Sequence, residues 1–317
     1  KYGHRDPNYE FGTNPCSEIV LRPYQFCNLS ECVVRHDDDK ETLLRKVRLA
    51  SILGTIQSTF TKFPYLRKVW QRNTEEERLL GVSLTGIYDN KLLCTQGEEL
   101  NALLTELREC ARDTNKEWAA ALGIPVSAAI TCVKPSGTVS QLVDSASGIH
   151  PRHSKYYIRR VRGDKKDPLT QFLVGQGVPA EDCVYKPTQT TVFSFPQRAP
   201  DGLVRDDVTP ISHLELWLTY QRHWCEHKPS VTISVAEGDW PAVGAWTWDH
   251  FGEISGVSYL PYDGGTYRQA PYEECTEEEY HALKASIPVV NWLELKENTD
   301  NVEGAQMLAC SAGVCEI

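Results

Sequence analysis

A short polar segment near the start of the chain brings together three side chains that can do chemistry. In the run NPCSEI, Asn14, Cys16 and Glu18 occupy alternate positions, and Cys27 follows eleven residues after Cys16. Alternate side chains of an extended segment share one face, so the sequence predicts that an amide, a thiol and a carboxylate lie together. Such a face offers hydrogen bonding, transfer of an electron or a hydrogen atom, and a base.

The sequence leaves two interpretations of Cys16 open. A lone cysteine is most often a small buried side chain without a chemical role. Burying Asn14 and Glu18 beside it without partners would be costly in free energy, however. A pocket that accepts a polyhydroxy substrate would supply partners for both, and this favours a functional site.

The loop KPSGTVSQL is a second candidate site. Ser136, Thr138 and Ser140 carry hydroxyls, and Gly137 lets the backbone approach an anion closely. The apolar residues 130–133 predict a buried strand, and a helix can start after the loop, where free backbone N–H groups bind phosphate. The Walker pattern is absent, and a turn without a ligand remains the alternative.

The last residues hold two cysteines, Cys310 and Cys315, in a segment of small side chains. Two thiols at this separation can form and reopen a disulfide, and a mobile terminus can visit two places in turn. Incidental cysteines at a frayed end and a zinc site are the alternatives, although no second Cys or His pair lies close enough in the sequence to complete four zinc ligands.

Composition narrows the class of protein. The 317 residues include 33 basic and 43 acidic side chains, a net charge of −10 that argues against nucleic acid as a partner. No apolar run reaches the roughly 18 residues that span a bilayer, so we expect a cytoplasmic protein without membrane contact. The eleven cysteines are odd in number and spread along the chain, which favours reduced thiols over a disulfide scaffold.

Two helices and several strands are expected to position these residues. Acidic side chains followed by apolar residues at helical spacing predict a helix within residues 37–57, and a longer one runs from residue 97 to Gly123, with Pro125 beyond. The run YYIRRVRG from Tyr156 predicts a strand, and residues 168–288 mix short strands and helices. A mixed α/β architecture follows.

A local group of basic side chains stands out against the acidic background in HPRHSKYYIRRVR. Two interpretations remain open: a solvated strand with alternating charges, or a surface near the phosphates of a nucleotide or corrinoid. The residues are His150, Arg152, His153, Lys155, Arg159, Arg160 and Arg162.

Four motifs, taken in order, resemble the catalytic subunit of ribonucleotide reductase. They are NPCSEI with a cysteine eleven positions later, KPSGTVSQL, SGIHPRHSKYYIRRVR and the terminal CxxxxC. The details are most similar to the adenosylcobalamin-dependent (class II) ribonucleoside-triphosphate reductases. The resemblance spans nearly the whole chain, although residues 165–285 contribute no motif.

The resemblance implies a ten-stranded α/β barrel of the ribonucleotide reductase and glycyl radical enzyme type. Because the first residue is Lys1 and the only methionine is Met307, we expect this chain to be the C-terminal portion of a longer or split enzyme. Residues 1–295 would then be the catalytic barrel portion with the radical-cysteine loop and the phosphate-binding loop. Residues 296–317 would be a flexible redox-active tail.

The resemblance also implies roles for the residues of NPCSEI and for Cys27. Cys16 would become the thiyl radical that takes a hydrogen atom from the ribose 3′ carbon. Glu18 would draw the proton from the 3′-hydroxyl, and Asn14 would hold the substrate hydroxyls. Cys27 would be one half of the dithiol that reduces the 2′ carbon as water leaves.

The later motifs receive roles by the same resemblance. Cys310 and Cys315 would re-reduce the active site and would themselves be reduced by thioredoxin or a similar dithiol reductant. The substrate phosphates would be held by Ser136, Gly137, Thr138 and Ser140.

The resemblance implies adenosylcobalamin as radical source, through cleavage of its cobalt–carbon bond, and a ribonucleoside triphosphate as substrate. In the family the partner of Cys27 lies upstream of the radical cysteine, and no cysteine precedes Cys16 here, so we expect the N-terminal half of the same enzyme as a partner. The alternatives are the catalytic subunit of an iron-dependent (class I) or diphosphate-using reductase and, from another class, a thiol-disulfide relay or zinc-binding module without radical chemistry.

Overall fold

The computed structural model describes residues 5–262 and 267–296 of the chain, and these fall into two compact units. The first unit contains residues 5–152 and 201–262, and the second contains residues 153–200 and 267–296. Both units combine helices with strands, so the predicted α/β class is confirmed at this level.

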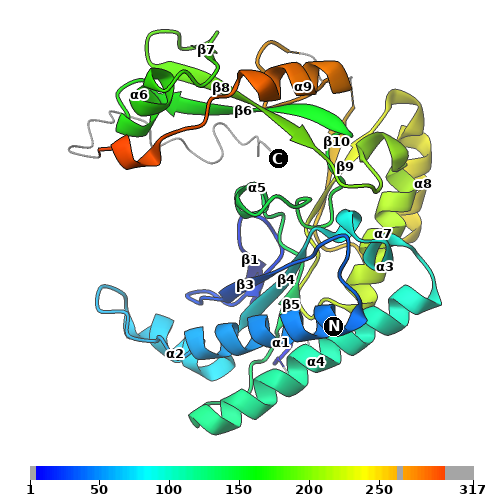
Figure 1. Ribbon diagram of the computed structural model, residues 1–317. Helices are drawn as coiled ribbons and strands as arrows, with labels where there is room; N and C mark the ends of the chain where they lie inside the picture. The colour runs from blue at the N-terminus through cyan, green and yellow to red at the C-terminus, as the bar shows by residue number, and fades with distance from the viewer. Residues whose placement is uncertain (1–4, 263–266, 297–317) are drawn as a thin grey trace. The chain divides into compact units, whose positions relative to one another are not determined.

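The first unit is a largely parallel arrangement of strands with helices packed on it (Figure 1). One sheet has the order β3-β4-β5 and another pairs β10 with β9, all parallel, and a parallel bridge between Val133 and Pro229 lies between the two groups. The strands are β1 (Gly12–Thr13), β2 (Val20–Leu21), β3 (Asn28–Val33), β4 (Leu80–Thr85), β5 (Thr131–Cys132), β9 (Val231–Val235) and β10 (Val257–Pro261). The helices are α1 (Lys40–Gln57), α2 (Lys68–Glu77), α3 (Lys91–Cys94), α4 (Glu98–Leu122), α5 (Val139–Leu142), α7 (Pro210–His223) and α8 (Trp240–Asp249).

The two long helices predicted from the sequence are α1 and α4. Helix α1 begins after Asp39, whose carboxylate accepts a hydrogen bond from the backbone N–H of Thr42 at 2.8 Å. Helix α4 ends at Gly123, which adopts φ 66°, a left-handed conformation that glycine tolerates best. The two helices lie side by side, and α1 packs on β3 and β4 (Figure 1). Both helix predictions are therefore confirmed.

Strand β4 is buried along its whole length because both faces of its sheet are covered. On the face toward α1, the side chain of Leu80 contacts Gly54, and the Ser30 hydroxyl donates to the Ala50 carbonyl at 3.0 Å. On the opposite face Gly81 lies against Ile19. The period-two alternation of the strands thus separates a helix-packed face from a face that receives the β1–β2 hairpin.

The second unit is built on an antiparallel sheet of order β11-β6-β8-β7. Strand β6 confirms the strand predicted at YYIRRVRG, and two of its basic side chains have partners on or beside β11: Arg160 pairs with Glu273 at 2.5 Å, and the Arg159 guanidinium lies 4.4 Å from the ring centre of Tyr272. These contacts favour the strand interpretation for Arg159 and Arg160, but with partnered rather than simply solvated charges, and Arg152, which precedes the strand, is buried and pairs with Asp89 at 3.0 Å. The elements are β6 (Tyr156–Asp164), α6 (Pro168–Gly175), β7 (Ala180–Asp182), β8 (Thr190–Arg198), β11 (Tyr272–Glu274) and α9 (Glu277–Ser286).

Within residues 5–262 and 267–296 the strands form sheets of two, two, four and three strands, and none of these closes into a barrel. The ten-stranded barrel is therefore not confirmed. Cys310 and Cys315 lie outside the described residues, so the division into residues 1–295 and a tail stays a prediction. No helix in the described ranges is long and apolar enough to cross a bilayer.

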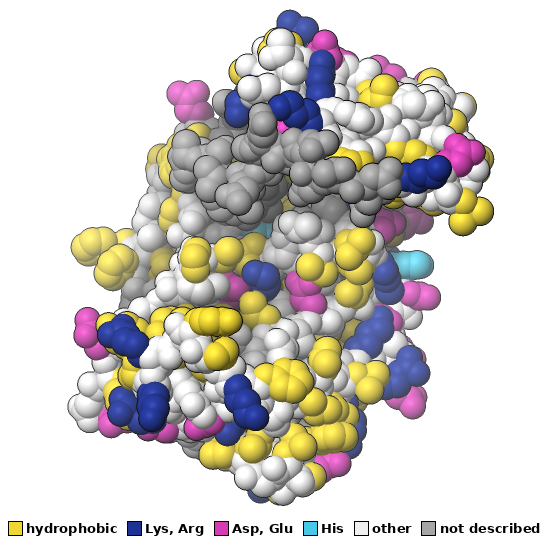
Figure 2. Space-filling model, turned by 90° about the vertical axis from the view of Figure 1, so that its left-hand side faces the viewer, with side chains coloured by type: hydrophobic (Ala, Val, Ile, Leu, Met, Phe, Trp, Pro, Cys, Tyr) yellow, Lys and Arg dark blue, Asp and Glu magenta, His cyan; other side chains and the backbone are white. Residues whose placement is uncertain are grey.

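Hydrophobic side chains are exposed on the first unit, and Figure 2 shows them interspersed with Lys and Arg on the side that faces left in Figure 1. In the connection between α1 and α2, Phe60, Tyr65 and Leu66 are exposed, and Leu49 and Leu53 are exposed on α1 itself. Scattered apolar residues are normal, but a group of this kind is typical of a surface that another protein segment covers.

Gly148 is a position where the fold requires glycine. It adopts φ 56°, and a Cβ atom there would lie 2.3 Å from the carbonyl oxygen of Lys134. We predict that Gly148→Ala lowers the free energy of unfolding by about 3 kcal/mol, from left-handed strain plus a backbone clash. Denaturant unfolding of the chain measures this change.

Gly123→Ala is the matched control. Gly123 is also left-handed, but no atom lies within 4 Å of the added Cβ, so only the conformational cost of about 1 kcal/mol is expected. Equal losses in the two variants would contradict the close approach of Gly148 to Lys134.

Candidate active site

The run NPCSEI forms the turn of the β1–β2 hairpin, in which Gly12 pairs with Leu21 and Thr13 with Val20. Asn14 Oδ1 accepts a hydrogen bond from the Ile19 N–H at 3.0 Å, and Ser17 adopts φ 64°. The expectation of an extended segment is therefore wrong, because the chain reverses here. The directions of the Asn14, Cys16 and Glu18 side chains are therefore set by the turn and do not follow the alternation of a strand.

The turn leaves its three predicted site residues in different environments. Asn14 and Cys16 are half-buried, whereas Glu18 is fully buried, with 0% of its surface exposed. Since Asn14 Oδ1 is already used in the turn, the amide nitrogen is the group that remains to donate to a ligand.

Neither carboxylate oxygen of Glu18 has a hydrogen-bond partner among the described residues. The Lys134 Nζ atom lies 3.6 Å from Glu18 Oε1, and the backbone N–H of Lys228 donates to the Glu18 carbonyl at 3.0 Å. Burial lowers the pKa of Lys228, and the charge of Glu18 acts against that shift. A buried carboxylate without hydrogen-bond donors is unfavourable by itself and is a common mark of a ligand site.

Cys27 lies close enough to Glu18 for the carboxylate charge to affect its thiol. Burial raises the pKa of the Cys27 thiol, Glu18 raises it further, and Arg5 and the Asn28 N–H act in the opposite direction. Cys132 on β5 is fully buried, and its pKa is raised by burial first and then by the nearby Cys27. The structure thus brings Glu18, Cys27 and a further thiol together, and no sequence motif had singled out Cys132.

Residues 134–138 of KPSGTVSQL form the loop after strand β5, and residues 139–142, which include Ser140, form the short helix α5, so the predicted order of strand, loop and helix is confirmed. Ser136 is buried with φ 53°, and its hydroxyl lies close enough to Glu31 to lower the pKa of that carboxyl, although no hydrogen bond of standard geometry joins the two side chains. Thr138 is exposed, and nothing lies within 4 Å of a Cβ placed on Gly137. The hydroxyl of Ser140 is engaged with that of Ser147 at 3.2 Å, so it is the least available of the four predicted phosphate ligands.

Two residues that sequence reasoning missed connect the hairpin with this loop. Glu31 on β3 shares the hairpin face of the sheet, because it pairs in register with Ser83, whose hydroxyl accepts the Lys134 N–H at 2.8 Å. Burial raises the pKa of Glu31, while Ser136 and the charge of Lys134 lower it. Lys134 therefore lies near two carboxylates. The sequence signal that could have identified Glu31 is a charged residue between Leu29 and Val33 within a strand.

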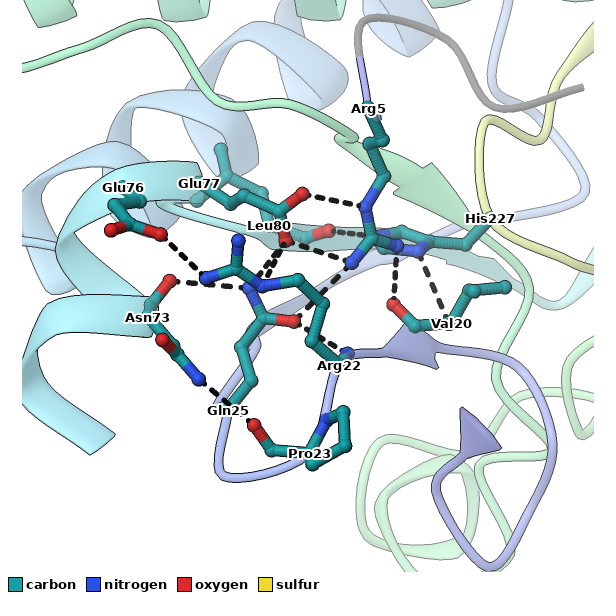
Figure 3. Close-up of polar contacts among 10 residues, drawn as sticks. All are labelled: Arg5, Val20, Arg22, Pro23, Gln25, Asn73, Glu76, Glu77, Leu80 and His227. Carbon is teal, nitrogen blue, oxygen red and sulfur yellow. Dashed lines mark hydrogen bonds and ion pairs between the residues drawn. The ribbon is translucent and has the colours of Figure 1, made fainter. Parts of the chain in front are cut away.

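A buried polar network fixes the base of the hairpin (Figure 3). Arg5 donates to both carboxylate oxygens of Glu77 at 3.0 and 2.8 Å, and Gln25 donates to the same carboxylate. Burial alone would raise the pKa of Glu77, but the hydrogen bonds from Arg5 and Gln25 and the charges of Arg5 and Arg22 outweigh it and lower the pKa. Arg22 also pairs with Glu76 at 2.7 Å.

No group of three or more His, Cys, Asp or Glu side chains in the described part of the chain is arranged to hold a metal ion. The terminal cysteines belong to residues that the structure does not describe.

Comparison with known proteins supplies names for similar chains, although no protein-family model matches this one. It is 32% identical, over 96% of its length, to a probable adenosylcobalamin-dependent ribonucleoside-triphosphate reductase of Dictyostelium discoideum, and 28% identical to the adenosylcobalamin-dependent ribonucleoside-triphosphate reductase of Euglena gracilis. A crystal structure of a B12-dependent (class II) ribonucleotide reductase superposes on 88% of the chain with a TM-score of 0.76 at 25% identity. The chain resembles an adenosylcobalamin-dependent ribonucleotide reductase.

The resemblance to these reductases covers a part of each relative. The chain spans 40% of the length of the Dictyostelium protein, 42% of the Euglena protein and 42% of the class II crystal structure. The alpha subunit of the class Id ribonucleotide reductase of Actinobacillus ureae, 14% identical with a TM-score of 0.53, shares the fold alone.

The raised pKa of Cys27 leads to a prediction about thiol reactivity. Only the thiolate is alkylated, and each unit of pKa increase lowers the thiolate fraction tenfold. We expect iodoacetamide at pH 8 to modify Cys27 at least about tenfold more slowly than an unperturbed thiol, with the rate still rising above pH 9. Mass spectrometry of the labelled peptide measures the rate.

Glu18→Gln removes one cause of this shift and should speed the alkylation of Cys27. Glu31→Gln is the control, because Glu31 is not among the groups that shift the pKa of Cys27. A Cys27 that reacts like a model thiol in the unmodified chain would contradict the assigned environment.

Proposed function

We propose that this chain carries the active site of an adenosylcobalamin-dependent ribonucleoside-triphosphate reductase, which converts ribonucleotides to 2′-deoxyribonucleotides. The observation that carries the proposal is Glu18, a fully buried carboxylate without hydrogen-bond donors, on the same hairpin turn as Cys16 and in the neighbourhood of Cys27. The names of the relatives and of the class II structural neighbour support the same proposal.

In this proposal the hairpin turn acts on the ribose. Cys16, as a thiyl radical, takes the hydrogen atom from the 3′ carbon and returns one at the end of the reaction. Glu18 accepts the proton of the 3′-hydroxyl, and that hydroxyl supplies the hydrogen bond that the buried carboxylate lacks. The amide nitrogen of Asn14 donates to a substrate hydroxyl. The Lys134 ammonium, 3.6 Å from Glu18 Oε1, places a positive charge beside the carboxylate.

Replacement of the 2′-hydroxyl by hydrogen releases water and consumes two electrons. Two thiols supply them and become a disulfide, so Cys27 provides one sulfur and a second cysteine must provide the other. In the family that second cysteine lies upstream of the radical cysteine, and we assign it to the N-terminal half of the enzyme.

We assign the substrate phosphates to the run KPSGTVSQL. The buried Ser136 hydroxyl, which lies near Glu31 without a hydrogen bond of standard geometry, and the exposed Thr138 hydroxyl are suited to donate to phosphate oxygens, and the open space at Gly137 allows backbone approach. Ser140 is assigned with them, although its hydroxyl would have to leave Ser147 to bind phosphate directly.

The residues of this chain fit adenosylcobalamin at one point, the half-buried thiol of Cys16 at the turn of the hairpin. When bound, the cofactor supplies a carbon radical through cleavage of its cobalt–carbon bond. An iron-dependent or diphosphate-using reductase is the alternative, since the motifs are largely shared. The names of the relatives favour adenosylcobalamin and triphosphates.

The N-terminal half of the enzyme is proposed as the partner that completes a ten-stranded barrel. The parallel strands β3, β4, β5, β9 and β10 would be one half of it, and both end strands, β3 and β10, have a single paired neighbour among the described strands. The exposed hydrophobic side chains on and after α1 and the 40–42% coverage of the relatives support a missing companion.

The test is a reductase assay with this chain and the matching N-terminal half. We expect deoxynucleotide to form from a ribonucleoside triphosphate only when adenosylcobalamin and a dithiol are added, without an iron-containing subunit. Half a barrel cannot hold the reacting atoms, and a misplacement of about 1 Å costs on the order of 10²-fold in rate, so the chain alone should be inactive.

Glu18→Gln is the active-site control in this assay, because it removes a base and keeps the shape. It should lower turnover by about 10²-fold and leave nucleotide binding intact. Activity that ignores the corrinoid but needs an iron-containing partner would overturn the cobalamin assignment. Undiminished turnover of the variant would overturn the role of Glu18.

The terminal cysteines are proposed to relay electrons from thioredoxin to the active-site dithiol that includes Cys27. We predict that a variant with both Cys310→Ser and Cys315→Ser makes about one product per active site from stored electrons and then stops with thioredoxin as reductant. Repeated thioredoxin-driven turnovers would contradict the relay. Stoichiometric zinc on the unmodified chain that is lost in the double variant would favour a zinc-binding module instead.

A further inference from the structure

Strand β2 is held by side chains from distant parts of the sequence. Val20 pairs with Thr13 of β1, yet both of its backbone groups bind elsewhere (Figure 3). Its carbonyl accepts from Arg5 Nη1 at 2.7 Å, and its N–H donates to His227 Nδ1 at 3.3 Å. The strand that follows the catalytic turn is therefore anchored by an arginine and a histidine.

His227 links this strand to the core of the sheet. Its Nε2 atom lies 2.9 Å from the carbonyl of Leu80 on the buried strand β4. A ring nitrogen that accepts from Val20 cannot carry a proton, so Nε2 carries it and donates to Leu80. The next residue, Lys228, donates its N–H to the Glu18 carbonyl at 3.0 Å. Two consecutive residues thus fix the backbone of Glu18 and of Val20.

The environment of His227 keeps the ring in this neutral state. His227 is buried, and burial lowers its pKa to about 4, with the Arg5 guanidinium adding to the effect. The ring therefore accepts from Val20 throughout the neutral pH range.

Arg5 is fixed as firmly on its other side. Its guanidinium is buried and binds both oxygens of the buried Glu77 at the end of α2, and it also donates to Gln25 Oε1 at 3.2 Å. Bidentate charge-assisted pairs of this kind restrict orientation as well as distance. Arg5 thereby connects the Val20 carbonyl to helix α2, and His227 connects the Val20 N–H to strand β4.

We propose that His227 and Arg5 are positioning residues that hold the backbone of residues 18–20 and so set the location of Glu18 and of the Cys16 turn. The catalytic part of this inference rests on the function proposed above, but the anchoring itself does not. The physical reason is that both catalytic side chains lie on a turn whose flanking strands are two residues long. Such a hairpin is marginal by itself and takes its position from what it is attached to.

His227→Gln is the variant that tests the anchor. The glutamine amide can still donate to the Leu80 carbonyl, but it presents no acceptor where Nδ1 lay, so the bond to Val20 is lost. Hydrogen exchange measured by mass spectrometry on the 317-residue chain should show about tenfold faster exchange in the peptide that covers residues 14–21. Protection of α1 and α4 should stay unchanged, which shows that the variant is folded.

His213→Gln is the matched control, because His213 is also buried, bonds a backbone carbonyl (Ile149, 2.8 Å) and makes no described hydrogen bond to the hairpin. It should leave exchange of residues 14–21 unchanged. Unaltered exchange in His227→Gln, or equal acceleration in both variants, would overturn the anchor whether or not the chain is a reductase.

The catalytic part is tested in the assembled enzyme with adenosylcobalamin. His227→Gln should lower kcat by roughly 10- to 100-fold and leave KM for the nucleotide within about threefold, since alignment is lost while the phosphate loop is untouched. Faster exchange with an unchanged kcat would overturn the positioning role. An unmodified enzyme that reduces no ribonucleotide would overturn the proposed function, while the exchange result would still decide the anchor.

Discussion

The carboxylate of Glu18 lies where water does not reach it, and the site is arranged around that constraint. An ionised group in such a place loses its hydration, and the Lys134 ammonium at 3.6 Å offsets only part of that loss. No donor in the described residues replaces the lost water. An arrangement of this kind lowers stability unless a ligand completes it, so its presence is explained better by binding and catalysis than by folding.

Packing of the sheet on which the site lies stabilises the fold and offsets the unfavourable burial of Glu18. Strand β4 is buried on both faces, with α1 packed on one and the β1–β2 hairpin on the other. Gly81 permits the approach of the hairpin, because a Cβ there would lie 3.0 Å from the Ile19 side chain, whereas a Cβ at Gly54 would make only an ordinary contact with Leu80. Helix packing therefore stabilises one face, and the opposite face is left to position polar groups: Glu31 and the Ser83 hydroxyl that binds Lys134.

The long helices and the main strand of the second unit were predictable because their signals are local. A cap at Asp39, apolar residues at helical spacing and the glycine at 123 are each read within a few residues. The turn at Ser17 was not predictable from alternation, because its left-handed conformation is favoured by the contacts of the folded hairpin. The partners of Arg159 and Arg160 were not predictable either, because they lie more than a hundred residues away in the sequence.

By itself the sequence determined which chemical groups the proposed site contains: the thiols Cys16 and Cys27, the carboxylate Glu18 and the hydroxyl-bearing run from Ser136. Residue types and short spacings are properties of the chain, and they also carried the resemblance to ribonucleotide reductases. Only the tertiary structure decided that Lys134 faces Glu18, that Glu31 joins them, and that His227 and Arg5 hold the strand after the turn. Proximity between residues far apart in sequence is set by strand register and helix packing, and no local pattern encodes it.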